Sequence, residues 1–310
     1  MLNTEEVLTV GVSTRALFNL EKENEVYETE GIEKFRDFQQ INENEILNPG
    51  TAFYLVKNLL DLNRVAGKVI VEIVVMSRNS PETGFRVLNS IAHHKLGITR
   101  LALTGGKPLS PYIEAYGIDL FLSRDENDVQ RVIDSNKCAA ALVYEPPIDF
   151  NPSHTQVKIA FDADAVIFSD ESEIRYKTEG LVSFQKFETD NQLVPMNEGP
   201  FANLLLKLSM VQKELPQNTE DSPLRLAIVT ARSAPSHMRV INTLRHWGVN
   251  IDEIYFMGGL SKDSVLKAFG AHIFFDDQET HVDPASKVVP SGRVLYNSES
   301  EMQKYKKLKK

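Results

Sequence analysis

Short apolar segments recur along this chain, and polar residues bound each of them. Continuous apolar runs are typical of strands in a parallel sheet, because helices cover both faces of such a sheet. We therefore predict strands at residues 7–12, 69–76, 100–104, 120–122, 139–144, 157–161, 224–230, 253–257 and 272–275.

The segments between these runs carry helical patterns. Met238, Ile241, Leu244 and Trp247 fall on one helix face at three-residue spacing, and Gly248 follows them as a stop signal. Strands that alternate with helices indicate an α/β fold in which a parallel sheet is covered on both faces.

The sequence also repeats itself. Four short matches recur in the same order at shifts of 149 to 153 residues: 16–18 with 166–168, 29–31 with 178–180, 86–89 with 239–242, and 105–106 with 258–259. Chance matches between apolar strands are common, but four in order favour a duplication. We therefore predict two duplicated Rossmann-like lobes with parallel sheets, at residues 1–150 and 151–310, with the boundary near Pro146, Pro147 and Pro152.

Composition and charge exclude some classes of binding partner. The 310 residues carry a formal net charge of −9, which disfavours nucleic acid and anionic membrane surfaces. Cys138 is the single cysteine, so it has no partner for a disulfide or a cysteine metal site. Residues 1–6 lack the features of a secretory signal and no long apolar span occurs, so we expect a cytoplasmic protein. Residues 303–310 contain five lysines and predict a solvated, charged tail.

Two carboxylates follow the predicted strand at 157–161. Side chains alternate along a strand, so Asp162 and Asp164 point the same way where the strand ends. Two like charges held close together need a cation or a proton between them, and Mg²⁺ favours carboxylate oxygens. Taken alone, this pair is more typical of an ordinary loop.

Three further strand ends carry polar residues. Thr230 ends the strand at 224–230 and Ala231 and Arg232 follow it, where a hydroxyl and backbone N–H groups near a helix start can receive phosphate oxygens. Lys262 follows the glycines after 253–257 and can neutralise a transferring phosphoryl group, with Lys267 as a less well placed rival. Each feature has an ordinary alternative, as a helix cap or a surface charge.

The strand at 272–275 ends in Asp276 and Asp277, of which one can bind the metal while the other orients Lys262 or water. Ligands bind at the carboxyl ends of strands in open α/β sheets, so we expect all four strand ends to converge on one site. Together they resemble the ordered motifs of the haloacid-dehalogenase superfamily: Phe161-Asp162-Ala163-Asp164-Ala165-Val166, Val229-Thr230, Lys262 and Phe275-Asp276-Asp277.

Neighbouring strings are similar to the cytosolic 5′-nucleotidase type I family from about residue 10 to 282: Ser13-Thr14-Arg15-Ala16-Leu17-Phe18, Phe168-Ser169-Asp170-Glu171-Ser172-Glu173, Val229-Thr230-Ala231-Arg232-Ser233-Ala234 and His272-Ile273-Phe274-Phe275-Asp276-Asp277-Gln278. The resemblance implies Mg²⁺-dependent hydrolysis of nucleoside 5′-monophosphates, with AMP as the first candidate. It implies that Asp162 attacks phosphorus, and that Asp164 protonates the leaving oxygen and then activates water.

The first lobe departs from this pattern, so we expect it to be catalytically silent. Its residues at the corresponding places are Val12 and Thr14 for the first two aspartates, Met76 for Thr230, and Ser123-Arg124 for Asp276-Asp277. Arg15 and Arg78 lie near this vacated site and are candidates for holding the phosphate of a regulatory nucleotide, although such arginines are more often surface charges.

A small lid is expected at about residues 170–200, after the first strand of the catalytic lobe. Its neighbourhood offers Phe184, Phe187 and Phe201 as a stacking surface, although most such phenylalanines belong to the core. Alternative functions are a phosphatase for another small phosphomonoester, a nucleoside phosphotransferase and a non-catalytic nucleotide sensor. The oligomeric state is open, and a homo-oligomer is compatible with the sequence.

Overall fold

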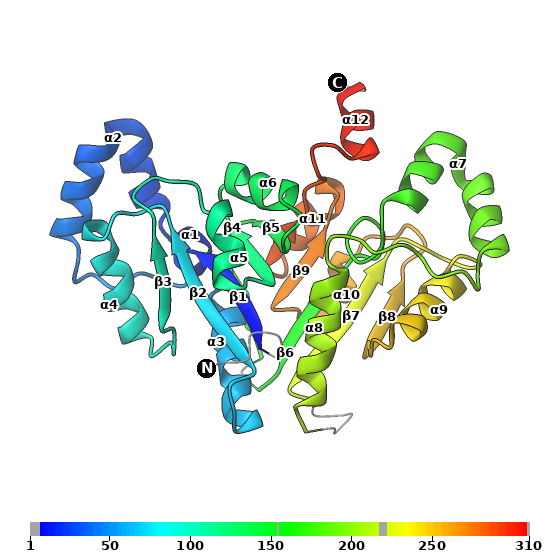
Figure 1. Cartoon of the computed structure of the whole chain (residues 1–310), viewed down its shortest axis with the longest axis horizontal. Coiled ribbons are helices and arrows are strands. Elements are labelled where there is room, and N and C mark those ends of the chain that lie inside the picture. The colour runs from blue at the N-terminus through cyan, green and yellow to red at the C-terminus, as the bar shows by residue number, and fades with distance from the viewer. Residues whose placement is uncertain (1–6, 154, 217–221, 309–310) are drawn as a thin grey trace.

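The computed structural model describes residues 7–153, 155–216 and 222–308. Within them, ten strands form one sheet in the order β3-β2-β1-β4-β5-β10-β9-β6-β7-β8 (Figure 1). The strands are β1 Leu8–Ser13, β2 Val71–Ser77, β3 Arg100–Leu103, β4 Leu120–Ser123, β5 Ala139–Val143, β6 Val157–Phe161, β7 Leu224–Thr230, β8 Glu253–Phe256, β9 Ile273–Asp276 and β10 Ser291–Arg293.

Helices connect the strands. They are α1 Thr14–Leu17, α2 Glu21–Ile41, α3 Phe53–Ala66, α4 Phe85–His93, α5 Ile113–Tyr116, α6 Glu126–Asp134, α7 Glu171–Asp190, α8 Ala202–Lys213, α9 His237–Trp247, α10 Asp263–Phe269, α11 Glu279–Ser286 and α12 Glu301–Leu308. The pattern that predicts a helix before Gly248 is confirmed, because α9 ends at that glycine, which adopts a left-handed conformation.

The predicted α/β fold with a mostly parallel sheet is confirmed. All strand pairs are parallel except β5 with β10. The expectation of separate parallel sheets needs correction, because this antiparallel pair joins the two halves edge to edge. Each half has the same strand order when it is followed inward from its outer edge, β3-β2-β1-β4-β5 and β8-β7-β6-β9-β10.

All nine predicted strands are present, but β10 was not predicted. Its three residues, Ser-Gly-Arg, carry no apolar run, so no period marks them. Gly292 fits because a Cβ there would lie 3.0 Å from the Ala141 Cβ and 3.3 Å from the Phe275 ring. The neighbouring strands pack so closely that a glycine is needed here, and only the tertiary structure brings those strands together.

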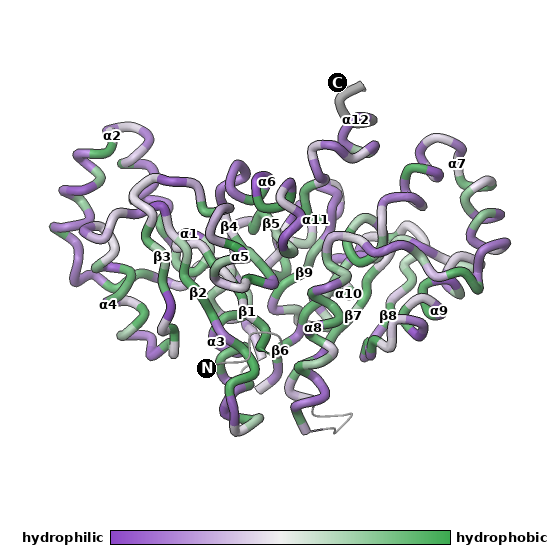
Figure 2. Tube along the Cα trace, viewed as in Figure 1, coloured by the Kyte–Doolittle hydropathy of each residue, from purple (hydrophilic) through white to green (hydrophobic). Residues whose placement is uncertain are grey.

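The core lies along the sheet. Figure 2 shows hydrophobic residues concentrated on the central strands and hydrophilic ones on the outer helices. Every residue of β1 and β9 is buried, as expected for strands covered on both faces. The halves also contact each other through α3 with β6 and α8 with β1. Asn58 of α3 donates to the Ser153 carbonyl at 2.7 Å across this junction.

The helices α2 and α7 stand at opposite ends of the molecule (Figure 1). Each consists of two arms, because a glycine with a positive φ interrupts the helix, Gly31 at 85° and Gly180 at 83°. Later in each half, the chain passes so close to itself that only glycine fits. A Cβ on Gly50 would lie 2.8 Å from the Ala16 carbonyl oxygen, and one on Gly199 would lie 2.3 Å from that of Phe168.

The two halves share this architecture, and the duplication itself stays a prediction. The lobe boundaries and the closing of residues 170–200 as a lid stay predictions. The charged segment at 303–310 lies partly in α12 and partly outside the described residues, as do residues 1–6 in full. Among the helices that the structure describes, none combines the length and apolarity needed to span a membrane.

Candidate active site

Four neighbouring strands bring the predicted site residues to one edge of the sheet. Asp162 follows β6 directly, Thr230 ends β7, and Asp276 ends β9. Lys262 comes from the turn after β8, where it precedes the first residue of α10. Because these strands are adjacent and parallel, their carboxyl ends meet at one place.

Lys262 lies between two carboxylates. Its Nζ is 2.8 Å from Asp162 Oδ1 and 2.7 Å from Asp276 Oδ2. All three side chains are buried. Buried charges are stable only when they are paired, and here one ammonium serves both acids. The rival Lys267 is exposed on α10, so Lys262 is the lysine of this site.

The two aspartates have opposite pKa shifts. Burial raises the pKa of Asp162 to about 7 and outweighs the attraction of Lys262, and the charge of Asp276 adds to the rise. Burial also acts to raise the pKa of Asp276, but Lys262 and His281 together hold it below its usual value. A second positive charge would therefore stabilise ionised Asp162.

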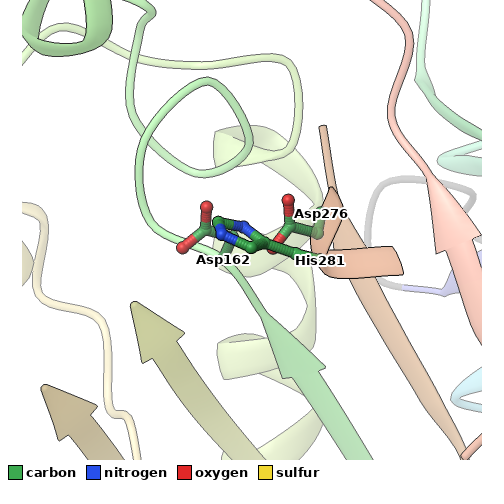
Figure 3. Close-up of side chains that lie close together, drawn as sticks. All are labelled: Asp162, Asp276 and His281. Atoms are coloured by element: carbon green, nitrogen blue, oxygen red, sulfur yellow. The ribbon is translucent and has the colours of Figure 1, made fainter. Parts of the chain in front are cut away.

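His281 is a site residue that the sequence analysis missed. Its Nδ1 lies 3.2 Å from Asp276 Oδ2, and Figure 3 shows the imidazole beside Asp162 and Asp276. Ligand atoms of these three residues lie within 4.8 Å of one another. The available signal was the position of His281 in the first turn of α11, directly after β9. A helix that starts at a site strand returns its first-turn side chains to that site.

The donor set fits a hard divalent cation. Carboxylate oxygens dominate the cluster, as Mg²⁺ prefers. In addition, Asp277 Oδ1 is buried and has no hydrogen-bond partner among the described residues, which is costly unless another group binds there. Asp276, Asp277 and Asp162 can thus hold a divalent cation in addition to the Lys262 ammonium, which contacts only Asp162 and Asp276 among these three.

Asp277 has a different environment from Asp276. Its Oδ2 accepts a hydrogen bond from the Tyr296 hydroxyl, which lies 2.9 Å from Glu173 Oε2 on α7. Burial raises the pKa of Asp277 well above its usual value, and the charges of Glu173 and Asp276 add to this effect. Asp277 therefore connects the site to α7, whereas Asp276 contacts Lys262.

Asp164, which the sequence analysis paired with Asp162 around a metal ion, points instead to Arg232, two residues after the end of β7, and the cluster of Asp162, Asp276 and His281 does not include it. The guanidinium donates two hydrogen bonds of 2.7 Å to this carboxylate, one from Nε and one from Nη2. Its Nη1 donates to Glu188 on α7. The Arg232 side chain is thus committed to carboxylates, although the sequence analysis assigned it to substrate phosphate. Its backbone N–H lies 3.2 Å from the Thr230 hydroxyl.

Glu188 is a second residue that the sequence analysis missed. The side chain is fully buried and also accepts from Arg239 Nη1 at 3.0 Å and from the Ser172 hydroxyl at 2.8 Å. Two guanidinium groups therefore share this one carboxylate. The network ties both arms of α7 to the strand end that carries Arg232, and so to Asp164.

The three candidate stacking phenylalanines have separate environments. Phe201 is fully buried and packs against Phe161 and Phe275, so it belongs to the core. Phe187 lies under Arg175, whose guanidinium is 4.0 Å from the ring centre. Phe184 lies 5.3 Å from the Arg232 guanidinium and pairs with Tyr176 at 6.1 Å. Of the three, Phe184 is the one whose ring faces the Arg232 guanidinium.

The strand ladders give the correspondence between the halves. Phe161 pairs with Ile228 and Phe275, just as Val12 pairs with Val75 and Leu122. The matching of Val12 with Asp162 and of Met76 with Thr230 was therefore wrong by one residue, because short apolar strands align equally well at either shift. The structural counterparts of Asp162, Thr230 and Asp276 are Ser13, Ser77 and Ser123.

Comparisons with known proteins address the family of the chain. The chain is 39% identical to human cytosolic 5′-nucleotidase 1B over 290 residues, which are 91% of this chain and 47% of that protein, so the match spans about half of the relative's length. A solved structure of histidinol dehydrogenase from Elizabethkingia anophelis aligns with a TM-score of only 0.24 at 10% identity, over 96% of this chain and 55% of that one. Residues 1–301 match the 5′-nucleotidase family. The chain therefore belongs to the 5′-nucleotidase family.

Proposed function

We propose that this chain is a Mg²⁺-dependent 5′-nucleotidase that hydrolyses nucleoside 5′-monophosphates, with AMP as the first candidate. The observation that carries the proposal is the contact of Lys262 with both Asp162 and Asp276 at the carboxyl edge of the sheet. Family membership and the relative named a cytosolic 5′-nucleotidase support the substrate class and a cytoplasmic location.

The reaction divides into two displacements. In the first, Asp162 attacks phosphorus, the bond from phosphorus to the ester oxygen breaks, and Asp164 gives a proton to the departing nucleoside. In the second, Asp164 takes a proton from water, which attacks the aspartyl phosphate and releases inorganic phosphate. A covalent intermediate replaces one difficult step with two easier ones.

The other residues stabilise charge. Lys262 neutralises the phosphoryl oxygens as negative charge spreads over them. We expect the Thr230 hydroxyl and the Ala231 backbone N–H to bind these oxygens, while the Arg232 backbone N–H donates to the Thr230 hydroxyl at 3.2 Å and orients it. Since the Arg232 guanidinium grips Asp164, its side chain positions the proton carrier, and the phosphate contact of this loop is left to the backbone and Thr230.

Asp162 and Asp276 would hold the metal, with Asp277 beside them and His281 orienting Asp276. When bound, Mg²⁺ supplies positive charge to the phosphoryl group and lowers the cost of bringing an anionic substrate to anionic residues. Both the buried Asp277 Oδ1, which has no hydrogen-bond partner among the described residues, and the raised pKa of Asp162 favour such an ion.

Steady-state phosphate release from AMP, IMP, CMP, UMP and their deoxy forms tests the proposal, in Mg²⁺ and in chelator. We expect release from nucleoside monophosphates only with the metal. Preference for a non-nucleotide phosphomonoester would overturn the substrate class. Added nucleoside should leave phosphate release unchanged, whereas transfer to that nucleoside identifies a phosphotransferase.

Asp162→Asn separates the enzyme from a nucleotide sensor. The variant should lose about 10⁴-fold or more in kcat, as removal of a nucleophile does, and should keep its affinity for AMP. Asp283→Asn is the matched control, because Asp283 is exposed on α11 near the site. A wild-type protein that binds AMP and releases no phosphate would contradict the proposal.

A further inference from the structure

The first half contains a cavity of about 390 Å³ at the carboxyl ends of β1 and β2. This volume falls in the range of about 300–1,000 Å³ that small-molecule sites occupy. Ser13, Ser77 and Ser123 line it, and they are the counterparts of Asp162, Thr230 and Asp276. The cavity thus lies where the second half has its active site.

Hydroxyls and arginines stand at this place where the second half has carboxylates. Arg15 lies two residues after Ser13, as Asp164 lies two residues after Asp162. Arg78 follows Ser77 where Ala231 follows Thr230, and Arg124 follows Ser123 where Asp277 follows Asp276. Four carboxylates of the second half are therefore replaced by two hydroxyls and two guanidiniums, and Arg78 adds a third guanidinium. Glu23, Asp125 and Asp128 also line the cavity, and Arg15 and Arg78 each pair with a carboxylate, Glu21 and Asp128 respectively. Each guanidinium has five N–H donors, so both can hold an anion as well, without the help of a metal ion.

Two other exchanges complete the difference. Leu109 follows the glycine pair 105–106 by the same interval that separates Lys262 from 258–259. Asp128 stands five residues after Ser123, as His281 stands five after Asp276, and it accepts a hydrogen bond from Arg78. Asp128 thereby holds Arg78 at the cavity, and Ser13 and Ser123 stand at the positions where Asp162 and Asp276 would hold the metal.

The wall of the cavity is suited to an aromatic ring. Tyr27 and Phe35, from the two arms of α2, form an edge-to-face pair at 5.7 Å and both line the cavity. Tyr176 and Phe184 of α7 form the equivalent pair in the second half, at 6.1 Å. Aromatic side chains beside cations are a recurrent way to bind a nucleobase with its phosphate.

Three buried polar atoms of the cavity residues make no hydrogen bond within the described part of the chain. Gln39 is 3% exposed, and its Oε1 accepts no hydrogen bond from the described residues. The Nε atoms of Arg15 and Arg78, both cavity residues, likewise make no hydrogen bond within the described part of the chain. Buried polar atoms are normally satisfied, so these three atoms point to a ligand.

We propose that this cavity binds a nucleoside phosphate without a metal ion, with the phosphate on Arg15 and Arg78 and the base against Tyr27 and Phe35. The ligand needs both a phosphate and a base, because the arginines lie at the strand ends and the aromatic pair lies on the two arms of α2. The site is separate from the proposed active site, and its existence does not depend on the catalytic function.

Isothermal titration calorimetry of the full chain in EDTA tests this site, with AMP, adenosine and inorganic phosphate as probes. We expect AMP to bind in chelator, and to bind at least about tenfold more tightly than adenosine or phosphate alone, since each part contributes. Absence of AMP binding in EDTA, or equal affinity for AMP and adenosine, would overturn the proposal.

Substitutions of cavity residues test whether AMP binds in this cavity. Arg78→Gln combined with Asp128→Asn removes the cation without leaving a buried carboxylate unpaired, and it should weaken AMP binding at least about tenfold. Tyr27→Ala changes a half-exposed side chain, so folding is spared, and should weaken binding about tenfold. If affinity in EDTA survives both changes, the cavity is not the site.

Matched controls lie outside the cavity. Arg100→Gln removes an arginine of the same half that pairs with Glu72 at 2.6 Å, and Tyr176→Ala removes the equivalent aromatic residue of α7. Neither should change AMP affinity in EDTA, nor should Lys262→Leu in the active site. Loss of binding in Tyr176→Ala or Lys262→Leu would show that AMP occupies the second half, which contradicts the proposal.

Discussion

The two halves of this molecule share a backbone plan and differ at the places where chemistry occurs. Each has five strands in the same order, a two-armed helix with a glycine at its centre, and a glycine that lets the chain pass close to itself. The strand ends carry aspartates and a lysine in one half, and serines, arginines and a leucine in the other. Fold and chemistry are thus encoded by different residues.

The buried arginine–carboxylate pairs of α2 and α7 also combine a shared arrangement with different residues. In the second half, Arg239 binds Glu188 on the later arm of α7, where Ser172 occupies the earlier arm. In the first half, Arg86 binds Glu23 on the earlier arm of α2, and Gln39 occupies the later arm. Each two-armed helix contains a buried carboxylate that pairs with an arginine, Glu188 with Arg239 and Glu23 with Arg86, but only Glu188 also binds Arg232 and so connects to Asp164.

Giving the second half the residue of the first should abolish activity. Lys262→Leu introduces the counterpart Leu109 and leaves Asp162 and Asp276 without their shared cation. We expect kcat for AMP to fall at least about 10³-fold, since a main charge-stabilising donor is lost. Lys267→Leu, an exposed lysine of the same helix, is the control. Retained activity in a folded Lys262→Leu protein would show that the halves do not differ at this position in the way we infer.

Metal removal should separate the halves. Chelation with EDTA should lower phosphate release at least about 10²-fold, because a bound cation supplies several kcal/mol of charge stabilisation. Mg²⁺ should also raise the unfolding temperature of the wild-type protein, since a ligand of the native state stabilises it. Asp276→Ser, which introduces the counterpart Ser123, should eliminate this thermal shift. An undiminished shift would place the ion elsewhere.

Substitution of the buried carboxylates Glu188 and Glu23 should affect activity differently. Glu188→Gln and Glu23→Gln each break a buried ion pair, and each should lower the free energy of unfolding by about 3 kcal/mol. Only Glu188→Gln should also lower kcat, by about tenfold, because Arg232 then holds Asp164 less firmly. Urea unfolding and AMP hydrolysis measure the two effects. Equal loss of kcat in both variants would indicate a general structural role.

The smallest effects concern the shared backbone plan. Gly199→Ala and Gly50→Ala place a Cβ against backbone atoms at 2.3 and 2.8 Å, so the backbone must shift. We expect each to lower the free energy of unfolding by about 1–3 kcal/mol, with Gly199→Ala the larger. Gly97→Ala is the control, because a Cβ there meets nothing within 4 Å. Thermal unfolding that ranks the three otherwise would contradict this account.

Much of the fold was predictable from the sequence. The apolar runs mark nine strands, and the alternation with helices indicates a mostly parallel α/β sheet. The strand β10 was not predictable, because its three residues have no period of their own and are held by β5 and β9. Without β10, the single ten-stranded sheet could not be inferred.

The site was predictable as a set of residue types. Asp162, Lys262 and Asp276 converge, as expected from polar residues at four strand ends. His281 and Glu188 were not found, because each lies on a helix and acts through a contact with a residue distant in sequence or on another element. The single-residue error in matching the halves has a similar cause, since only the hydrogen-bonded ladder sets the register.

The sequence alone determined the apolar runs of nine strands, the glycines that permit tight turns and the chemical types at the strand ends, because these depend on neighbouring residues in the chain. The tertiary structure alone decided which charges meet. Lys262 between two aspartates, Arg232 between Asp164 and Glu188, and the cavity beside Arg78 all arise from strand order and helix placement. Charges interact through space, so the partner of a buried charge is set by the fold and not by distance along the chain.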